Sequence, residues 1–419
     1  MTAEPSGPSL ARRLTTPDAV VIGVGSMVGA GLFSAFAPAA GAAGALLLLS
    51  LGVAALVALC NAASSAQLAA QYPTSGGTYV YGRERLGPWW GFVAGWGFVI
   101  GKTASCAAMA LVFAAYLVPD AWQKPVAVGA VVALAAVNYR GITRTARLTR
   151  VIVTLVLVLL AVVLVAVAVA GARPDPVDLV TGAVGAGGVL QGAAILFFAF
   201  AGYARIATLG EEVVDPTRTI PRAILGAFAV VVPLYAVTGV VLLGVLGVDA
   251  LASSPAPLRA AAATVTSGAW LQLVVVVAAA AATLGALLAL IAGVGRTALA
   301  MAREGDLPRP LSAVHERYAV PHVAEVTVAA VVCVLVLVTD LRAAIGFSSI
   351  GVLTYYAVAN ASALTQQEPH RRYPRLVPVV GLLGCVVLAL AVPATSLVAG
   401  IAVLAVGLLG RLVVRRRTT

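Results

Sequence analysis

The stretch GVGSMVGAGLFSA, from Gly23 to Ala35, lies inside an apolar run that begins at Val20. Glycines occupy positions 23, 25, 29 and 31 of this stretch. A glycine in a helix interior is about 1 kcal/mol less favourable than an alanine. A concentration of glycines at the middle of an apolar run therefore favours an interrupted helix, although glycines also permit close packing between membrane helices.

The composition indicates a polytopic helical membrane protein. Of the 419 residues, 61% are hydrophobic and 10% are charged, and the mean hydropathy is +1.02. Soluble domains do not have such values. The formal net charge of +11 would suit nucleic-acid binding, but the arginines form short clusters between apolar runs, as they do in cytoplasmic loops. We therefore expect the protein to contact the lipid bilayer and not nucleic acid.

Twelve apolar runs are candidates for transmembrane helices, each of which needs about 20 residues. They cover residues 19–43, 45–71, 89–118, 125–139, 149–171, 187–208, 220–247, 267–301, 323–339, 343–364, 376–392 and 394–412. The sequence therefore predicts an all-α polytopic membrane protein. We expect one transmembrane domain over residues 18–412, between a cytoplasmic tail at 1–17 and a basic cytoplasmic tail at 413–419.

The distribution of positive charge predicts the orientation, because cytoplasmic loops are enriched in lysine and arginine. An even number of spans with both termini in the cytoplasm places nearly all of the 27 lysines and arginines in inner segments. The outer loops then contain Lys124, Arg173, Arg259 and Arg342, and Lys102 lies within a span. We therefore expect a multi-pass protein of the plasma membrane.

A second interruption is predicted in the sixth span, where AILFFAFAGYARIATLGEE, Ala194 to Glu212, contains Gly202. Non-helical backbone is tolerated at membrane depth only where it is buried in protein or lines a cavity. The start of a half-helix offers free amides and a positive dipole end to an anion. Unwound carbonyls can accept hydrogen bonds from a cation. Two such interruptions together suit a zwitterion.

Three segments resemble signatures of the amino acid–polyamine–organocation (APC) superfamily of permeases, which have the LeuT-type fold. They are GVGSMVGAGLF (23–33) in the first helix, FFAFAGYARIATLGEEVVDPTRTIPRAI (197–224) in and after the sixth, and GRTALAMAREGDLPRPLSAVHERYAVPHVA (295–324) after the eighth. The resemblance implies a five-plus-five inverted repeat, with helices 1–5 at about 18–171 and helices 6–10 at about 187–364. It also implies accessory helices 11 and 12 at about 376–412, and breaks in helices 1 and 6 at mid-membrane.

The same resemblance implies an amino acid or amine bound at the two breaks. The amides that would bind a carboxylate belong to Ser26, Met27, Val28, Gly29, Ala30 and Gly31. The carbonyls that would bind an ammonium lie near Ile22, Gly23 and Gly25 on helix one and near Phe197, Phe198 and Phe200 on helix six. Ala201 and Gly202 complete the expected substrate-binding residues. Phe198 occupies the position of an aromatic lid in some relatives; its alternative role is that of an ordinary core or lipid-facing side chain.

Lys102 is the charge that lies well inside a predicted span, about 18 Å beyond Trp90 at 1.5 Å per residue. An intramembrane lysine is unfavourable unless it is paired, hydrated or neutral, and no acidic residue lies at a matching depth. We expect it to be neutral or to contact helix-end carbonyls, and to serve coupling or substrate orientation. The alternative is a side chain that extends to the inner face.

The inner half of helix eight, GALLALIAGVGRTA, has no hydroxyl before Thr297. A sodium site in the LeuT-type fold normally needs hydroxyls there, so we expect proton symport or exchange. Acidic residues after helix six, among them Glu211, would pair with Arg222 or Arg303 as an inner gate. As loop charges they could equally be solvated, because surface ion pairs are weak.

The predicted function is secondary active transport of an amino acid. The presumed pocket contains no Asp or Glu, which favours a neutral substrate; a cationic amino acid, a polyamine or amine, or an exporter of the same family is the alternative. An enzyme would need a constellation of catalytic side chains and a channel a selectivity filter, and neither pattern is found. The four cysteines lie in apolar runs and the three histidines in loops, so we expect no metal and no cofactor.

Overall fold

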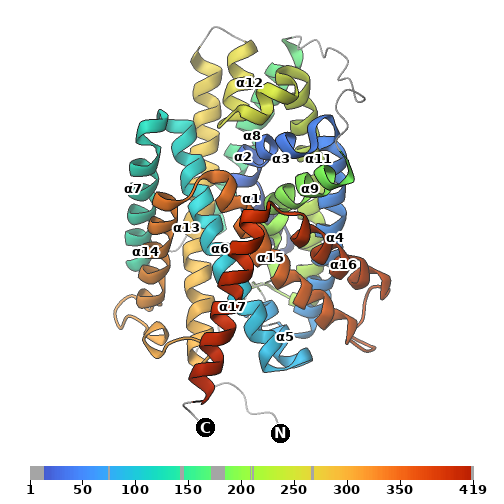
Figure 1. Ribbon diagram of the computed structural model, residues 1–419, viewed down its shortest axis with the longest axis vertical. Coiled ribbons are helices and arrows are strands. Elements are labelled where there is room, and N and C mark those ends of the chain that lie inside the picture. The colour runs from blue at the N-terminus through green and yellow to red at the C-terminus, as the bar shows by residue number, and fades with distance from the viewer. Residues whose placement is uncertain are drawn as a thin grey trace.

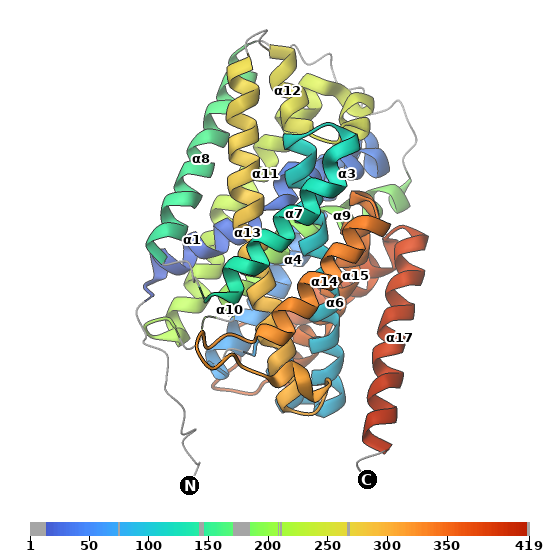
Figure 2. The same ribbon diagram turned by 90° about the vertical axis from the view of Figure 1, so that its left-hand side faces the viewer.

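A computed structural model describes residues 14–73, 76–141, 146–170, 185–207, 209, 212–265 and 269–416. In these ranges the chain forms helices and one isolated β-bridge, between Leu14 and Val213, but no named strand. The predicted all-α class is therefore confirmed. The helices form an elongated bundle, shown in two views at right angles in Figure 1 and Figure 2.

The helices before the sixth span have the following bounds: α1 Thr16–Met27, α2 Ala30–Ser34, α3 Phe36–Ala43, η1 Gly44–Leu46, α4 Leu47–Gln71, α5 Thr78–Leu86, α6 Pro88–Leu117, α7 Asp120–Tyr139 and α8 Ala146–Val169. The remaining helices are α9 Ala186–Phe200, η2 Ala201–Tyr203, α10 Ala204–Ala207, α11 Pro216–Ser253, α12 Pro257–Val265, α13 Ala269–Arg303, η3 Arg309–Ser312, α14 His322–Val338, α15 Leu341–Leu364, α16 Leu376–Ala391 and α17 Ala394–Arg416.

The described helices agree with the predicted spans in number and order. Ten are long and apolar enough to cross a bilayer, and α14 and α16 are shorter apolar helices at the positions of spans nine and eleven. The first two spans are separated at Gly44, which has a φ of 54° and directly follows α3. Glycine adopts this left-handed conformation without the strain that a side chain would cause. Gly247, with a φ of 69°, likewise interrupts α11 where span seven was predicted to end.

Helix α6 lies at the centre of the bundle and packs most closely on α15. A Cβ atom at Gly101 would lie 3.0 Å from the backbone nitrogen of Val352, and one at Gly351 would lie 2.6 Å from the carbonyl oxygen of Gly97. Glycines at this crossing therefore bring the two backbones into contact, as small residues do in membrane helix pairs. Because α6 is buried along most of its length, its polar side chains face protein and not lipid.

Two short helices lie at opposite ends of the bundle (Figure 1). Helix α5 connects spans two and three, and α12 connects spans seven and eight. Helix α5 lies in the segment from Tyr72 to Trp90, which links α4 to α6. Trp89 and Trp90, 37% and 52% exposed, follow it at the start of α6, where an aromatic belt would meet the bilayer surface.

Candidate functional site

The first transmembrane helix is interrupted at the glycine-rich stretch, as predicted. Helix α1 ends at Met27 and α2 begins at Ala30, and Gly29 between them has a ψ of −137°, outside the helical range. The backbone is again helical at Ala35, whose amide donates to the carbonyl of Gly31, so that α2 is continued by α3. The first amides of this second half-helix have no partner within their own helix.

The sixth helix changes from an α-helix to a 3₁₀ turn and does not unwind. After α9 the chain makes the 3₁₀ turn η2, and α10 follows with four residues. Ala201 and Ala204 keep right-handed helical dihedrals through this change. The predicted interruption is therefore present as a 3₁₀ turn and not as an extended segment. Where an α-helix changes to a 3₁₀ turn, some carbonyls lose their usual partner in the helix and become available to side chains.

The two interrupted segments contact each other through glycines. A Cβ atom at Gly202 would overlap the carbonyl group of Ser26 and would lie 2.6 Å from the backbone nitrogen of Met27. A Cβ atom at Gly31 would lie 2.5 Å from the Cβ of Ala199. Since Met27 and Ala199 are both buried, the breaks of helices one and six form one compact, closed junction in this conformation.

Lys102 reaches this junction from α6. Its ammonium nitrogen donates a 2.9 Å hydrogen bond to the carbonyl oxygen of Ala201, and its side chain is buried. The same oxygen accepts a 3.1 Å hydrogen bond from the hydroxyl of Tyr356 on α15. The prediction that Lys102 contacts a helix-end carbonyl is therefore confirmed, and the side chain does not extend to the inner face. Its coupling role stays a prediction.

Tyr235 of α11 contacts both breaks. Its hydroxyl lies 2.6 Å from the carbonyl oxygen of Met27 and 3.0 Å from that of Ala199. The single O–H of this phenol is therefore shared between a carbonyl of α1 and a carbonyl of α9. Tyr235 was missed by sequence reasoning. A tyrosine in an apolar run has no spacing signal that identifies the carbonyl it will meet.

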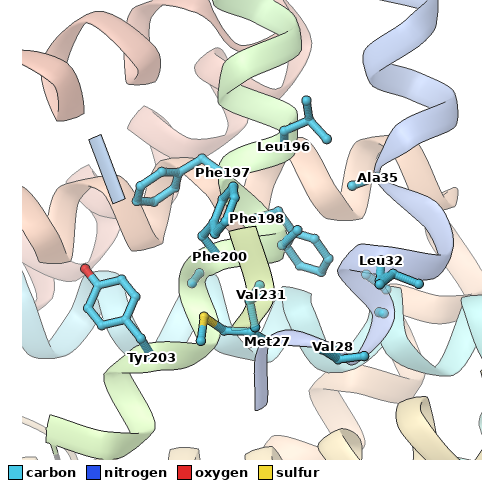
Figure 3. Close-up of a cluster of buried hydrophobic side chains, with 14 of the residues drawn as sticks. Met27, Val28, Leu32, Ala35, Leu196, Phe197, Phe198, Phe200, Tyr203 and Val231 are labelled. Atoms are coloured by element: carbon cyan, nitrogen blue, oxygen red, sulfur yellow. The ribbon is translucent and has the colours of Figure 1, made fainter. Parts of the chain in front are cut away.

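Aromatic side chains surround the junction (Figure 3). Phe197 meets Tyr356 edge to face at 5.8 Å, and Phe200 packs against Phe228 and Tyr235 of α11 at 5.9 and 5.0 Å. No such ring contact is found for Phe198 among the described residues, and it is 7% exposed. Of the three phenylalanines, Phe197 and Phe200 are thus fixed against neighbouring helices.

The remaining predicted contacts on helix one lie before the break. A Cβ atom at Gly23 would lie 2.9 Å from Cγ1 of Ile206 on α10, and Gly25 faces Val153 of α8. The carbonyl of Ile22 accepts a 2.8 Å hydrogen bond from the hydroxyl of Ser26, one turn later. Ile22, Gly23 and Gly25 therefore line the contact of α1 with its neighbours. The junction itself is formed by Ser26 to Gly31 together with Ala201 and Gly202.

Most of the predicted gate residues form no ion pair with one another in this conformation. Glu211 lies outside the described residues. The carbonyl of Glu212 accepts a hydrogen bond from the amide of Leu14 at 3.0 Å. Asp215 pairs with Arg218, at 3.7 Å and three residues along the same turn. In the described ranges no salt bridge includes Arg303, so the Glu211–Arg303 gate stays a prediction.

A buried ionic cluster forms instead around Asp306, just after α13. This carboxylate pairs with Arg411 of α17 at 2.7 Å and with Arg83 of α5 at 3.2 Å. It also accepts a 2.9 Å hydrogen bond from the hydroxyl of Tyr79. Burial, with the nearby Asp306 carboxylate, raises the pKa of Tyr79, so the phenol stays protonated and donates. The cluster joins three distant parts of the chain, α5, the segment after α13 and α17.

The guanidinium of Arg411 is also enclosed by rings. It lies 4.6 Å from the ring centroid of Trp89 and 4.7 Å from that of Phe92, and it donates to the carbonyl of Pro88 at 2.8 Å. A cation over aromatic faces is stabilised by their quadrupoles. The last helix is thereby fixed to the start of α6.

A second ion pair joins Asp18, in the first turn of α1, to Arg150 near the start of α8. The carboxylate of Asp18 also accepts hydrogen bonds from the amide and hydroxyl of Thr15. The start of the broken first helix is thus linked to the fifth span. Sequence reasoning did not pair these two residues, which lie 132 positions apart.

In the described part of the chain no group of three potential metal ligands is found, and the four cysteines form no disulfide. Each cysteine lies in a transmembrane helix as a free thiol. The chemistry available at the junction is therefore that of backbone amides and carbonyls, one lysine and several tyrosine hydroxyls.

Comparison with known proteins places this geometry in a family. A model of the amino acid permease family matches residues 14–408. An uncharacterized transporter of Mycobacterium tuberculosis is 59% identical over 399 residues, covering 95% of this chain and 90% of its own. The chain therefore belongs to the amino acid permease family of the APC superfamily. It is a multi-pass membrane transporter and not an enzyme.

Two more distant relatives have named substrates. The branched-chain amino acid permease of Bacillus subtilis is 26% identical over 416 residues, covering 91% of this chain and 88% of its own. The chloroplastic cationic amino acid transporter 7 of Arabidopsis thaliana is 29% identical over 384 residues, covering 85% of this chain and 66% of its own. The family thus includes transporters of both substrate classes.

Proposed function

We propose that this protein moves a neutral amino acid across the plasma membrane by alternating access. The observation that supports this proposal best is the junction of the two interrupted helices. There the first amides of α2 and the carbonyl of Ala201 lie on two segments that touch at Gly202. A carboxylate would bind the amides and an ammonium the carbonyls, as the chemistry of half-helix ends favours.

The distribution of acidic residues supports a neutral side chain on the substrate. Among the described residues the buried acids are Asp18, Asp306 and Glu325. Two lie in the first turns of α1 and α14, and Asp306 lies just after α13. A cationic side chain at the junction would therefore have no carboxylate beside it from the part of the chain that the structure describes. A cationic amino acid or amine is the second candidate, and the relatives that are cationic amino acid transporters favour it.

Proton symport or exchange fits the junction better than sodium symport. Lys102 is a titratable group bonded directly to the carbonyl of Ala201, at the junction. On α13 the hydroxyls of Thr283 and Thr297 donate to carbonyls of their own helix, at 2.6 and 3.2 Å. Lys102 would gain or lose a proton as the junction opens, and would thereby couple proton movement to substrate release.

The arrangement of short helices supports two inverted repeats, at about 18–171 and 187–364. Helix α5, between the second and third helices of the first repeat, lies at one end of the bundle. Helix α12, between the second and third helices of the next repeat, lies at the other end (Figure 1). Repeats of opposite orientation would place matching elements at opposite ends. With both termini cytoplasmic, the α5 end faces the cytoplasm.

The experiment that tests this function is uptake of labelled amino acids by proteoliposomes containing the purified protein. We expect saturable uptake of a neutral amino acid, stimulated by the same unlabelled amino acid inside, without a requirement for sodium. Lysine and putrescine would serve as competitors for the second candidate. Uptake that strictly requires a sodium gradient would contradict the proposed coupling. Uptake of lysine or putrescine alone would contradict the neutral substrate.

A further inference from the structure

A groove on the side of the bundle lies between α7 and α14, the fourth and ninth spans. The two helices lie side by side at the periphery of the molecule (Figure 2). The groove has a volume of about 540 Å³, within the range of small-molecule sites. It is separate from the junction of helices one and six.

The walls of the groove are two matching stripes of mostly small apolar side chains. The stripe on α7 consists of Val132, Ala135, Ala136 and Tyr139, and that on α14 of Val326, Ala329, Ala330 and Cys333. Both follow the spacing i, i+3, i+4, i+7, which lines one helix face. The paired alanines create the hollow, because larger side chains at these positions would fill it. Val132 and Val326 are 56% and 52% exposed, so the groove opens toward the surrounding bilayer.

One end of the groove is basic and aromatic. Arg140 and Tyr318 line it there. The guanidinium of Arg317 lies 5.5 Å from the ring centroid of Tyr318, and Tyr139 packs edge to face on Tyr318 at 6.3 Å. In the described residues neither Arg140 nor Arg317 forms a salt bridge, even though Glu316 lies next to Arg317. Within the described ranges, two cations thus lie without a carboxylate partner at the end of an apolar groove.

This basic end is the inner one. The loop that contains Tyr318 follows α13, whose end is bound to α5 through Asp306 and Arg83. By the orientation proposed above, the α5 end faces the cytoplasm. Cytoplasmic leaflets contain anionic lipids that attract basic residues near the membrane surface.

We propose that the groove binds one anionic phospholipid of the inner leaflet. An acyl chain lies between the alanine stripes of α7 and α14, and the phosphate contacts Arg140 and Arg317. The hydroxyls of Tyr139 and Tyr318 lie at the level of the headgroup, where aromatic residues of membrane proteins are enriched. Charge complementarity selects an anionic lipid over a zwitterionic one, since a choline headgroup would place a cation beside the two arginines.

The test is lipid retention after the full-length protein is extracted from vesicles of equal parts phosphatidylglycerol and phosphatidylcholine. Native mass spectrometry counts the lipids that remain bound through stepwise delipidation. We expect one phosphatidylglycerol to be retained by the wild type. The double variant R140Q/R317Q should bind it about 25-fold more weakly, because each cation near an anionic lipid contributes about a fivefold factor.

Two further variants separate the groove from general charge effects. Arg375→Gln with Arg218→Gln removes the same charge from exposed positions away from α7 and α14, and should retain the lipid. Ala330→Phe fills the groove and leaves both arginines, and should lose it. Equal retention of phosphatidylcholine, or retention unchanged in both R140Q/R317Q and A330F, would overturn the proposal. A protein dimer that A330F dissociates, with no bound lipid, would assign the groove to a second copy instead.

Discussion

The ammonium of Lys102 lies 2.9 Å from the carbonyl oxygen of Ala201, the first residue after α9. A cation on the third span is thereby bonded to the interruption of the sixth. The contact is buried, and a second donor, the hydroxyl of Tyr356, reaches the same oxygen. Any movement that separates α6 from the sixth helix must break or replace this bond. We therefore expect the protonation state of Lys102 and the position of the sixth helix to be linked.

Lys102→Met should flatten the pH dependence of transport. The substitution keeps an apolar stem of similar length and removes the titratable donor, while Tyr356 still satisfies the carbonyl of Ala201. Uptake by proteoliposomes across a range of external pH is the measurement. Lys124→Met is the control, because Lys124 is exposed near the start of α7. An unchanged pH profile in Lys102→Met would remove Lys102 from coupling.

Gly202→Ala should abolish transport and destabilise the protein. The added methyl group would overlap the carbonyl of Ser26. This overlap involves backbone atoms, so it is relieved only if the first and sixth helices move apart at their breaks. We expect a loss of about 1–3 kcal/mol in unfolding free energy, measured as a lower melting temperature in detergent. Gly52→Ala is the matched control on α4, where a Cβ atom would meet no atom within 4 Å. Normal uptake by Gly202→Ala would show that the junction is not tightly closed.

Tyr235→Phe should loosen the junction without changing its apolar packing. It removes the hydroxyl that lies within hydrogen-bond distance of the carbonyls of Met27 and Ala199, and it leaves the ring against Phe200. A buried carbonyl without a donor costs about 1–3 kcal/mol. The prediction is a lower melting temperature together with a changed apparent affinity for substrate. Tyr373→Phe, which lies in the loop before α16, serves as the control. If the two variants behaved alike, Tyr235 would have no particular role at the breaks.

Arg411→Ala should destabilise the ionic cluster around Asp306 more than it affects substrate binding. The substitution leaves the buried carboxylate of Asp306 with Arg83 and Tyr79 alone. Breaking a buried ion pair by removing one partner costs about 3–5 kcal/mol. Melting temperature and substrate affinity, measured on the same preparation, separate the two effects. The double variant R411M/D306L removes both charges and should recover part of the stability, whereas further loss would show that the pair itself is not the cause.

The sequence permitted correct predictions where a local pattern has a direct physical meaning. The glycines from Gly23 to Gly31 predicted the break in the first helix, because their effect on helix stability is local. The depth of Lys102 predicted a partner among helix-end carbonyls, because an intramembrane ammonium requires one. Hydropathy predicted the number and order of spans, because each crossing of the bilayer needs about 20 apolar residues.

Contacts between distant residues could not be predicted in this way. Tyr235, Tyr356 and Arg411 lie in apolar runs, and their partners Ala199, Ala201 and Asp306 are more than 30 residues away in the sequence. The form of the sixth-helix interruption also depends on packing, since a single glycine is compatible with both an unwound segment and a 3₁₀ turn. The groove between α7 and α14 arises from two alanine stripes, each of which resembles an ordinary helix face by itself.

The central claim is that the two helix breaks bind both charged groups of a small zwitterion. Its most direct measurement is calorimetric binding of the transported amino acid, compared with its methyl ester and its N-acetyl derivative, to the purified protein. Because hydrogen bonds to charged groups contribute about 1.5–3 kcal/mol, each blocked compound should bind about 10- to 100-fold more weakly than the parent. An ester and an N-acetyl derivative that both bind as tightly as the parent amino acid would contradict the account.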